Sequence, residues 1–128
     1  MIKNKFIFIS LLLLPFIVAC SSTPDKNITT EHPLKLYLEQ KFSQSSGASI
    51  ESVDDSLGIL TIKLSSLGVG DIGSVAIDVA ITLNRHPEIS FSKVNIIYQQ
   101  EQASFTKEIF DKYRTGQIND IQFMESLS

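Results

Sequence analysis

Apolar residues recur at helical spacing in two stretches of the chain. The first begins at Pro33, a residue suited to the first position of a helix, and is followed by Leu34, Tyr37, Leu38, Lys41 and Phe42. This helix is expected to end between Ser43 and Gly47, where small and polar residues replace the pattern.

The second helical stretch runs from Asp71 to Arg85. Its apolar face has positions i, i+3, i+4, i+7, i+8 and i+11, which are Ile72, Val75, Ala76, Val79, Ala80 and Leu83. Its polar face carries Asp71, Ser74, Asp78, Thr82 and Arg85. Asp71 is the expected N-cap, and Pro87 ends the helix just after His86.

Three stretches alternate between apolar and polar positions and predict strands. Ala48–Val53 and Ile59–Ser65 are expected to form a β-hairpin, because the residues between them are turn formers, namely Asp54, Asp55, Ser56 and Gly58. In the second strand one face carries Leu60, Ile62 and Leu64. The third strand is expected over Ser90–Gln99, where Val94, Ile96 and Tyr98 alternate with Lys93, Asn95, Ile97 and Gln99.

The resulting order, α-β-β-α-β, predicts an α/β (α+β) fold, a small two-layer sandwich with a helical hairpin after it. Because the strands have one strongly apolar face, both helices are expected on that face, with the other left to solvent. Ile59, Phe91 and Ile97 are expected on the solvent side and form the candidate interaction surface. Either the C-terminal segment covers them, through Phe105, Ile109 and Phe123, or they are open to a partner.

The chain after Gln102 predicts two short helices. Phe105, Ile109 and Tyr113 lie at i, i+4 and i+8, Gly116 suits the left-handed turn that ends a helix, and Asn119 can cap a second helix with Phe123 and Leu127. The run resembles the bacterial C-terminal helical hairpin called the SHOCT domain, through Ile109, Phe110, Tyr113, Gly116, Ile118, Asn119, Phe123 and Leu127. The alternative is an amphipathic helix pair docked onto the sheet.

The N-terminus has the pattern of an export signal. Lys3 and Lys5 precede the apolar run Phe6–Val18, which is too short to cross a hydrocarbon core of roughly 30 Å. The four residues that end it, Ile17, Val18, Ala19 and Cys20, resemble the lipobox of bacterial lipoproteins. That resemblance implies cleavage before Cys20, a thioether-linked diacylglycerol on Cys20 and firm membrane anchoring. Ser21 is compatible with the outer membrane, facing the periplasm, if the source is Gram-negative.

The predicted organisation is therefore a signal peptide at 1–19, a lipidated polar tether at 20–32, the sandwich at 33–102 and the helical hairpin at 103–128. Fully extended, the tether from Ser21 to His32 could reach about 40 Å. Cleavage leaves a mature chain of 109 residues, with nine basic and fourteen acidic side chains and a formal charge of −5. This balance argues against nucleic acid as a partner. Cys20 is the single cysteine, so the chain cannot form an internal disulfide.

One motif suggests nucleotide binding. Gly68, Gly70 and Gly73 spell GxGxxG between a predicted strand and a predicted helix, the setting of a dinucleotide-binding turn. However, Asp71 would place a negative charge where the pyrophosphate belongs, and the acid expected beyond the next strand could only be Glu101, 28 residues past Gly73. We therefore interpret the motif as a loop followed by a capped helix and expect no nucleotide.

The remaining polar residues predict no catalytic, metal or cofactor site. His86 is expected to have a structural role at a helix C-terminus, and His32 belongs to the end of the tether. Asp54 and Asp55 could bind calcium but are more typical of a solvated hairpin tip. The favoured interpretation is a non-enzymatic envelope lipoprotein that binds another protein, as an assembly accessory or an inhibitor or immunity factor. A ligand- or wall-binding module and a small envelope hydrolase remain the alternatives.

Overall fold

The computed structural model describes residues 31–128. The predicted signal peptide, Cys20 and the tether as far as Thr30 lie outside the described residues. Helix α1 spans Pro33–Ser43, strands β1 and β2 span Ser49–Ser56 and Ile59–Ser66, and helix α2 spans Ile72–Arg85. They are followed by β3 (Lys93–Tyr98), β4 (Glu101–Thr106), α3 (Lys107–Arg114) and α4 (Asp120–Glu125). The predicted α/β sandwich with a C-terminal helical part is confirmed, with one strand added.

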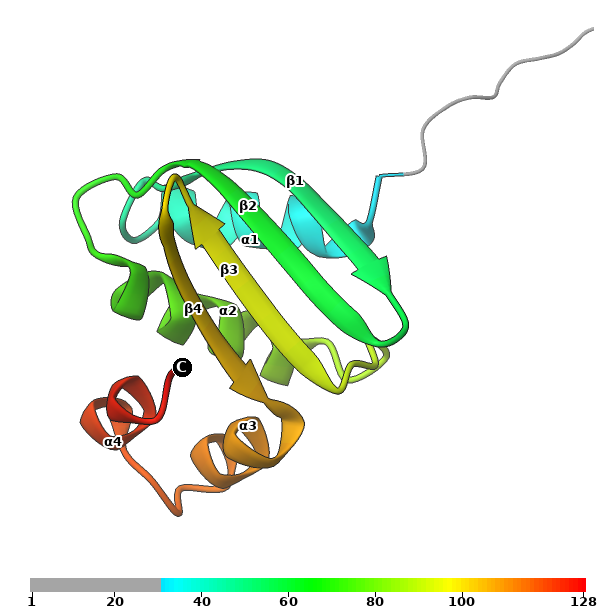
Figure 1. Ribbon diagram of the computed structural model, residues 1–128, viewed down its shortest axis with the longest axis vertical. Coiled ribbons are helices and arrows are strands. Elements are labelled where there is room, and N and C mark those ends of the chain that lie inside the picture. The colour runs from blue at the N-terminus through cyan, green and yellow to red at the C-terminus, as the bar shows by residue number, and fades with distance from the viewer. Residues whose placement is uncertain (1–30) are drawn as a thin grey trace, which may run out of the picture. The chain divides into compact units, whose positions relative to one another are not determined.

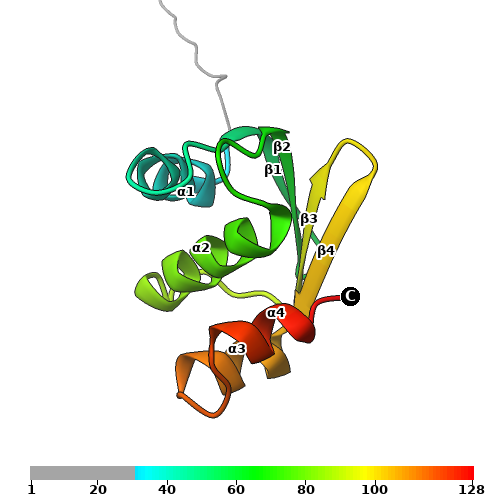
Figure 2. The same cartoon turned by 90° about the vertical axis from the view of Figure 1, so that its left-hand side faces the viewer.

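The four strands form one sheet in the order β1-β2-β3-β4 (Figure 1). The outer pairs are antiparallel hairpins, whereas β2 and β3 are parallel and joined through α2. The helices lie in a layer on one side of the sheet (Figure 2). The expectation that one face of the sheet has no helix on it is therefore confirmed for the described residues.

Strand β4 was not expected, and the helix expected to begin near Phe105 begins at Lys107 instead. Gln99 adopts a left-handed φ of 54°, and the chain then returns along β3, which places Phe105 opposite Val94. The predicted boundary at 102/103 falls inside this strand. The i, i+4, i+8 spacing of Phe105, Ile109 and Tyr113 was misleading, because it runs across the junction between β4 and α3.

The β1–β2 turn is also tighter than expected. Leu57 and Gly58 have φ values of 55° and 81°, as in two-residue hairpin turns that match the twist of the strands. Asp54 and Asp55 consequently lie in β1, opposite Thr61 and Leu60, and not in the turn.

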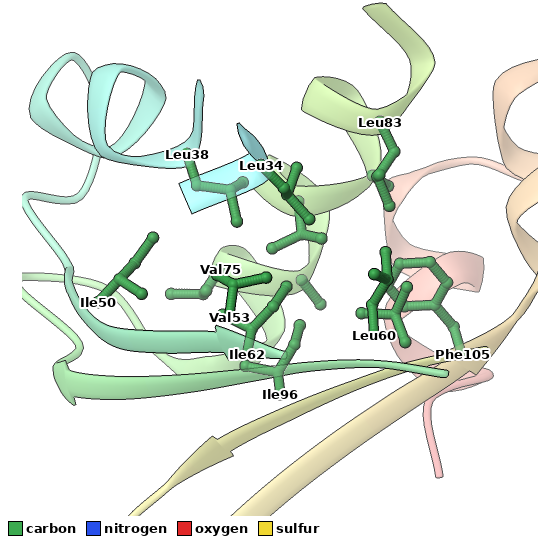
Figure 3. Close-up of a cluster of buried hydrophobic side chains, with 14 of the residues drawn as sticks. Leu34, Leu38, Ile50, Val53, Leu60, Ile62, Val75, Leu83, Ile96 and Phe105 are labelled. Atoms are coloured by element: carbon green, nitrogen blue, oxygen red, sulfur yellow. The ribbon is translucent and has the colours of Figure 1, made fainter. Parts of the chain in front are cut away.

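The core lies between the helices and the sheet. Figure 3 shows side chains from α1, α2 and all four strands meeting in this layer, and Leu34, Val75, Leu60 and Ile96 are among those with no exposed surface. The alternation predicted for β2 is confirmed, since Leu60, Ile62 and Leu64 are all buried.

Helix α2 begins as predicted. The Asp71 carboxylate accepts a hydrogen bond from Ser74 N at 2.9 Å, and Ser74 Oγ accepts one from Asp71 N at 3.0 Å, which together form a capping box. The hydrogen bond from the Ser74 backbone amide is the largest cause that lowers the pKa of Asp71, followed by a hydrogen bond from the Ser74 side chain. Thr82 was expected on the polar face of α2 but is buried. The reason is that α1 packs beside α2 and covers this part of its surface.

The C-terminal helices pack against α2 and β4. Thr106 caps α3, Gly116 has the predicted left-handed φ of 81° after it, and Asn119 caps α4 through a bond from Gln122 N of 2.8 Å. Beyond α4, Ser128 exchanges two backbone hydrogen bonds of 3.0 and 3.1 Å with Ser104 of β4. The helix pair is thus attached to the sheet at both of its ends.

Candidate functional site

The structure separates the three residues of the predicted interaction surface. Phe91 is 9% exposed and belongs to the core, where its ring lies edge-on to Phe110 with centroids 5.2 Å apart. Its predicted place on the solvent side of the sheet is wrong, because β3 begins only at Lys93 and the segment before it turns toward α3. Ile59 and Ile97 do lie on the helix-free face, half-buried.

The helix-free face is mostly polar. Its central row pairs Asp54, Thr61, Asn95 and Ser104 across the four strands, and Asn95 Oδ1 is shielded from solvent with no hydrogen-bond donor among the described residues. Ile97 pairs with Lys63, four positions along β2 from Ile59, which corresponds to a separation of roughly 13 Å. The two isoleucines therefore form no continuous apolar patch.

The C-terminal helices do not cover Ile59 and Ile97. Phe105, Phe110 and Phe123 belong to the same core cluster as α2, on the other side of the sheet, and Ile109 packs against that cluster. Of the two alternatives, the one in which Phe105, Ile109 and Phe123 cover the solvent face is wrong, because these side chains pack on the helical side of the sheet. Within residues 31–128 no helix covers the helix-free face (Figure 2), although the chain end reaches β4, where Ser128 pairs with Ser104.

The helical layer has a more concave surface than the sheet. A hollow of about 220 Å³ lies between the C-terminal end of α2 and α3. Its apolar wall consists of Leu83, Ile89, Phe91 and Phe110, and its rim carries Asn84, Pro87, Lys107 and Arg114. Lys107 Nζ lies 5.9 Å from the centroid of Phe91 and 6.0 Å from that of Phe110. An apolar recess is thus placed directly beside cationic groups.

Two further hollows adjoin this one. The second, about 330 Å³, shares Asn84 and Arg114 with the first and adds Ala80, Ile81, Arg85 and Tyr113. The third, about 120 Å³, shares Arg85 with the second and lies between α1 and α2. We call the three together the basic trough; its basic residues are Lys41, Arg85, Lys107 and Arg114.

No Asp or Glu lines these three hollows, but a neighbouring hollow of about 580 Å³ shares Tyr113 with the second and is lined by Asp120. The carboxylates paired next to it are Asp111 and Glu88. Asp111 accepts from Arg114 Nε at 2.8 Å and lies 3.4 Å from Lys107 Nζ, whereas Glu88 lies 3.3 Å from His86 Nδ1. Asp120, which accepts from the Tyr113 hydroxyl, is a third carboxylate at the margin, so the four basic side chains line the trough while acids border it.

Asp111 holds two of the trough's cations in position. The hydrogen bond from Arg114 lowers the pKa of Asp111 most, and the nearby charge of Lys107 lowers it further. The Asp111 carboxylate therefore stays ionised, and it orients the Lys107 and Arg114 side chains from one turn of α3.

Tyr113 and Asp120 form the boundary of the trough toward α4. The Tyr113 hydroxyl donates to Asp120 Oδ1 at 2.6 Å. Burial, followed by the hydrogen bond to Asp120, raises the pKa of Tyr113 to about 12. This bond connects α3 to α4 beside the rings of Tyr113 and Phe123, which are tilted by 32° with centroids 4.6 Å apart.

The glycine motif has a packing explanation. A Cβ atom at Gly68 would lie 2.1 Å from the Ser46 carbonyl oxygen, because this loop closes against the α1–β1 connection, where Val69 N donates to Ser46 O. A Cβ at Gly70 would meet the Ser74 hydroxyl at 2.5 Å. The Asp71 carboxylate itself receives the amide of Ser74 at the start of α2. These contacts account for Gly68 and Gly70 through the fold, and a Cβ at Gly73 would lie 3.2 Å from Met124 Sδ.

The histidines have structural positions. His32 belongs to the fold and not to the tether, since its Nδ1 accepts from Leu34 N at 3.1 Å and caps α1. The His86 ring stacks on Tyr37 with centroids 3.7 Å apart, which joins α2 to α1. Asp54 and Asp55 are neighbours in a strand and so point to opposite faces, and no cluster of three potential metal ligands is found within residues 31–128.

No family model, curated protein or solved structure matches the chain. The resemblances to the lipobox and to the SHOCT hairpin therefore stay predictions, and Cys20 lies outside the described residues. None of the helices from Glu31 onward has the length and apolar character needed to cross a membrane.

Proposed function

We propose that the chain is a membrane-anchored envelope lipoprotein that acts as a non-enzymatic module and binds another protein through the basic trough. The lipobox resemblance at Cys20 supports the anchor and a position on the outer membrane facing the periplasm in a Gram-negative source. The binding role is supported by the composition of the trough. An apolar recess lies beside basic side chains, and no Asp or Glu lines its three hollows.

The size of the recess favours a protein partner over a small molecule. Pockets that enclose a small ligand have volumes of roughly 300–1,000 Å³. The hollow beside Phe91 and Phe110 has about 220 Å³ and shares two lining residues with the next one. It suits one inserted side chain of a larger molecule, in the manner of the aromatic and aliphatic anchors of protein interfaces.

The polar groups of the trough suit binding more than catalysis. Guanidinium groups offer five N–H donors and no acceptor, so Arg85 and Arg114 can bind anions but cannot take up a proton from a substrate. The imidazole that lines the trough, His86, is engaged by Tyr37 on its face and by Glu88 at Nδ1. The trough is therefore an anion-recognition surface around an apolar recess.

The proposal can be tested by photo-crosslinking in membranes. Benzoylphenylalanine replaces Asn84, which lines two of the hollows, in the full-length lipidated chain, and the matched control places it at Thr61 on the helix-free face. We expect a covalent adduct with a protein from position 84 and none from position 61. Adducts from position 61 alone, or adducts only with lipid or glycan, would contradict the proposal.

A further inference from the structure

We infer that the partner segment is acidic and inserts one large apolar side chain between Phe91, Phe110 and Leu83 while its carboxylates pair with Arg85 and Arg114. This inference rests on the proposed function and specifies the chemistry of its partner.

The recess for the apolar side chain is already formed. The Phe91 and Phe110 rings meet at 74° with centroids 5.2 Å apart, and Leu83 completes the wall from α2. Both phenylalanines and Leu83 belong to the core cluster and are 9% exposed or less, so a side chain in the hollow would meet the outer edges of residues fixed by the core. A rigid apolar recess of this size is typical of the sites that receive the anchoring residue of a partner.

The carboxylate-binding groups lie next to the recess. Arg114 lines both the first and the second hollow, and its Nε is occupied by Asp111, whereas no described residue accepts from its two terminal amino groups. Arg85 is exposed, lines the second and third hollows and has no ion-pair partner within residues 31–128. Arg guanidinium groups bind carboxylates through paired N–H donors, which gives both charge and geometry.

Charge complementarity selects this occupant. The chain is acidic as a whole, and its strand β1 carries Glu51, Asp54 and Asp55, yet the trough is lined by four basic residues and no acid. Because Arg85 has no acidic partner among the described residues and Arg114 bonds Asp111 only through Nε, an acidic segment can pair with these two groups, whereas β1 repels it. A bilayer of anionic lipids presents the same charge but a flat surface, which cannot enter the recess.

A library experiment tests this inference directly. The mature chain, residues 20–128 with Cys20→Ser so that no lipid is attached, is immobilised and panned against random dodecapeptides on phage. We expect the enriched peptides to carry a large apolar residue flanked by Asp or Glu. Neutral or basic enriched peptides, or no enrichment, would overturn the inference.

Charge reversal then locates the binding surface. Arg85→Glu/Arg114→Glu is expected to weaken the enriched peptide at least tenfold, and Arg85→Glu alone serves as a milder variant that leaves the Asp111 contacts in place. Lys63→Glu/Lys93→Glu on the helix-free face has the same change in net charge and should alter the affinity less than twofold. Equal losses in both double variants would overturn the inference.

Two further results would distinguish an acidic protein segment from anionic lipid headgroups as the ligand of the trough. Binding of the unlipidated chain to phosphatidylglycerol vesicles that depends on Arg85 and Arg114 would assign the trough to lipid headgroups and overturn the inference. A protein adduct at position 84 whose crosslinked segment lacks acidic residues would also overturn it while leaving the proposed function intact. Acidic peptides that bind at the trough without any protein adduct at position 84 would instead contradict the proposed function.

Discussion

The Phe105 ring of β4 meets the Phe123 ring of α4 edge-on, with centroids 5.1 Å apart. Both side chains are buried, and Phe123 also lies 4.6 Å from the Tyr113 ring of α3. The C-terminal helices therefore complete the hydrophobic core from the edge strand and are not an appendage of a separate sandwich.

Phe123→Ala should consequently destabilise the whole fold. Removing a fully buried aromatic side chain costs about 3–5 kcal/mol, because transfer energy is lost and a cavity remains. We expect the free energy of unfolding in urea to fall by this amount in one cooperative transition. Ile121→Ala, on the same helix but 63% exposed, is the control and should change it by less than about 1 kcal/mol. A Phe123→Ala chain that loses only α4, with the rest as stable as before, would show that the helix pair is independent.

Gly68→Ala should show whether the glycine motif serves the fold. The added Cβ would lie 2.1 Å from a backbone oxygen at a residue with φ of 67°, so both the backbone and the Ser46 segment must move. We expect a loss of more than about 2 kcal/mol in the free energy of unfolding. Gly116→Ala is the matched control, because its φ is 81° but nothing lies within 4 Å of the added atom. It should cost only about 1–2 kcal/mol from the left-handed backbone alone. Equal effects of the two substitutions would contradict the packing explanation.

Tyr113 should titrate late and set an alkaline limit to stability. Its pKa in the folded chain is about 12, against 10.0 for an ordinary tyrosine, because burial and the bond to Asp120 favour the protonated form. The corresponding stabilisation is fully present below the unfolded value of about 10 and is lost as the pH rises through the folded value. Tyrosinate absorbance in a Tyr37→Phe/Tyr98→Phe background reports the midpoint, with circular dichroism as the check on folding.

Asp120→Asn should lower this pKa only in part. The substitution removes the carboxylate charge, whereas the burial of Tyr113, the largest cause of the shift, remains. A midpoint near 10 in the folded chain before any substitution would contradict the hydrogen-bonded arrangement of Tyr113 and Asp120.

Cys20→Ser tests the anchor. If Cys20 is lipidated, the substituted chain should remain an uncleaved precursor and should incorporate no labelled fatty acid, because the thiol that forms the thioether is gone. Ser21→Ala, one residue further on, is the control and should leave labelling and cleavage unchanged. Labelling that persists in the Cys20→Ser chain would exclude the lipobox interpretation.

Local features of the fold could be predicted from individual residues. Asp71 and Asn119 were recognised as helix caps and Gly116 as a left-handed terminator, because side-chain length and the freedom of glycine act within a few residues. The apolar alternation of Leu60, Ile62 and Leu64 likewise identified the buried face of β2. Strand β4 was missed because Ala103 and Phe105 are its two apolar residues, and its pairing with β3 depends on the turn at Gln99.

By itself, the sequence determined the elements with strong periodicity, their caps, the side of the sheet that carries helices, and an N-terminus that predicts a lipid anchor. Only the tertiary structure decided which side chains share a surface. Phe91 was expected on the solvent face but lines a recess beside Phe110. The basic residues of the trough come from three helices and are Lys41, Arg85, Lys107 and Arg114. The physical reason is that periodicity assigns a residue to a face of its own element, whereas a trough forms where faces of different elements meet, at angles and distances set by the packing of the whole core.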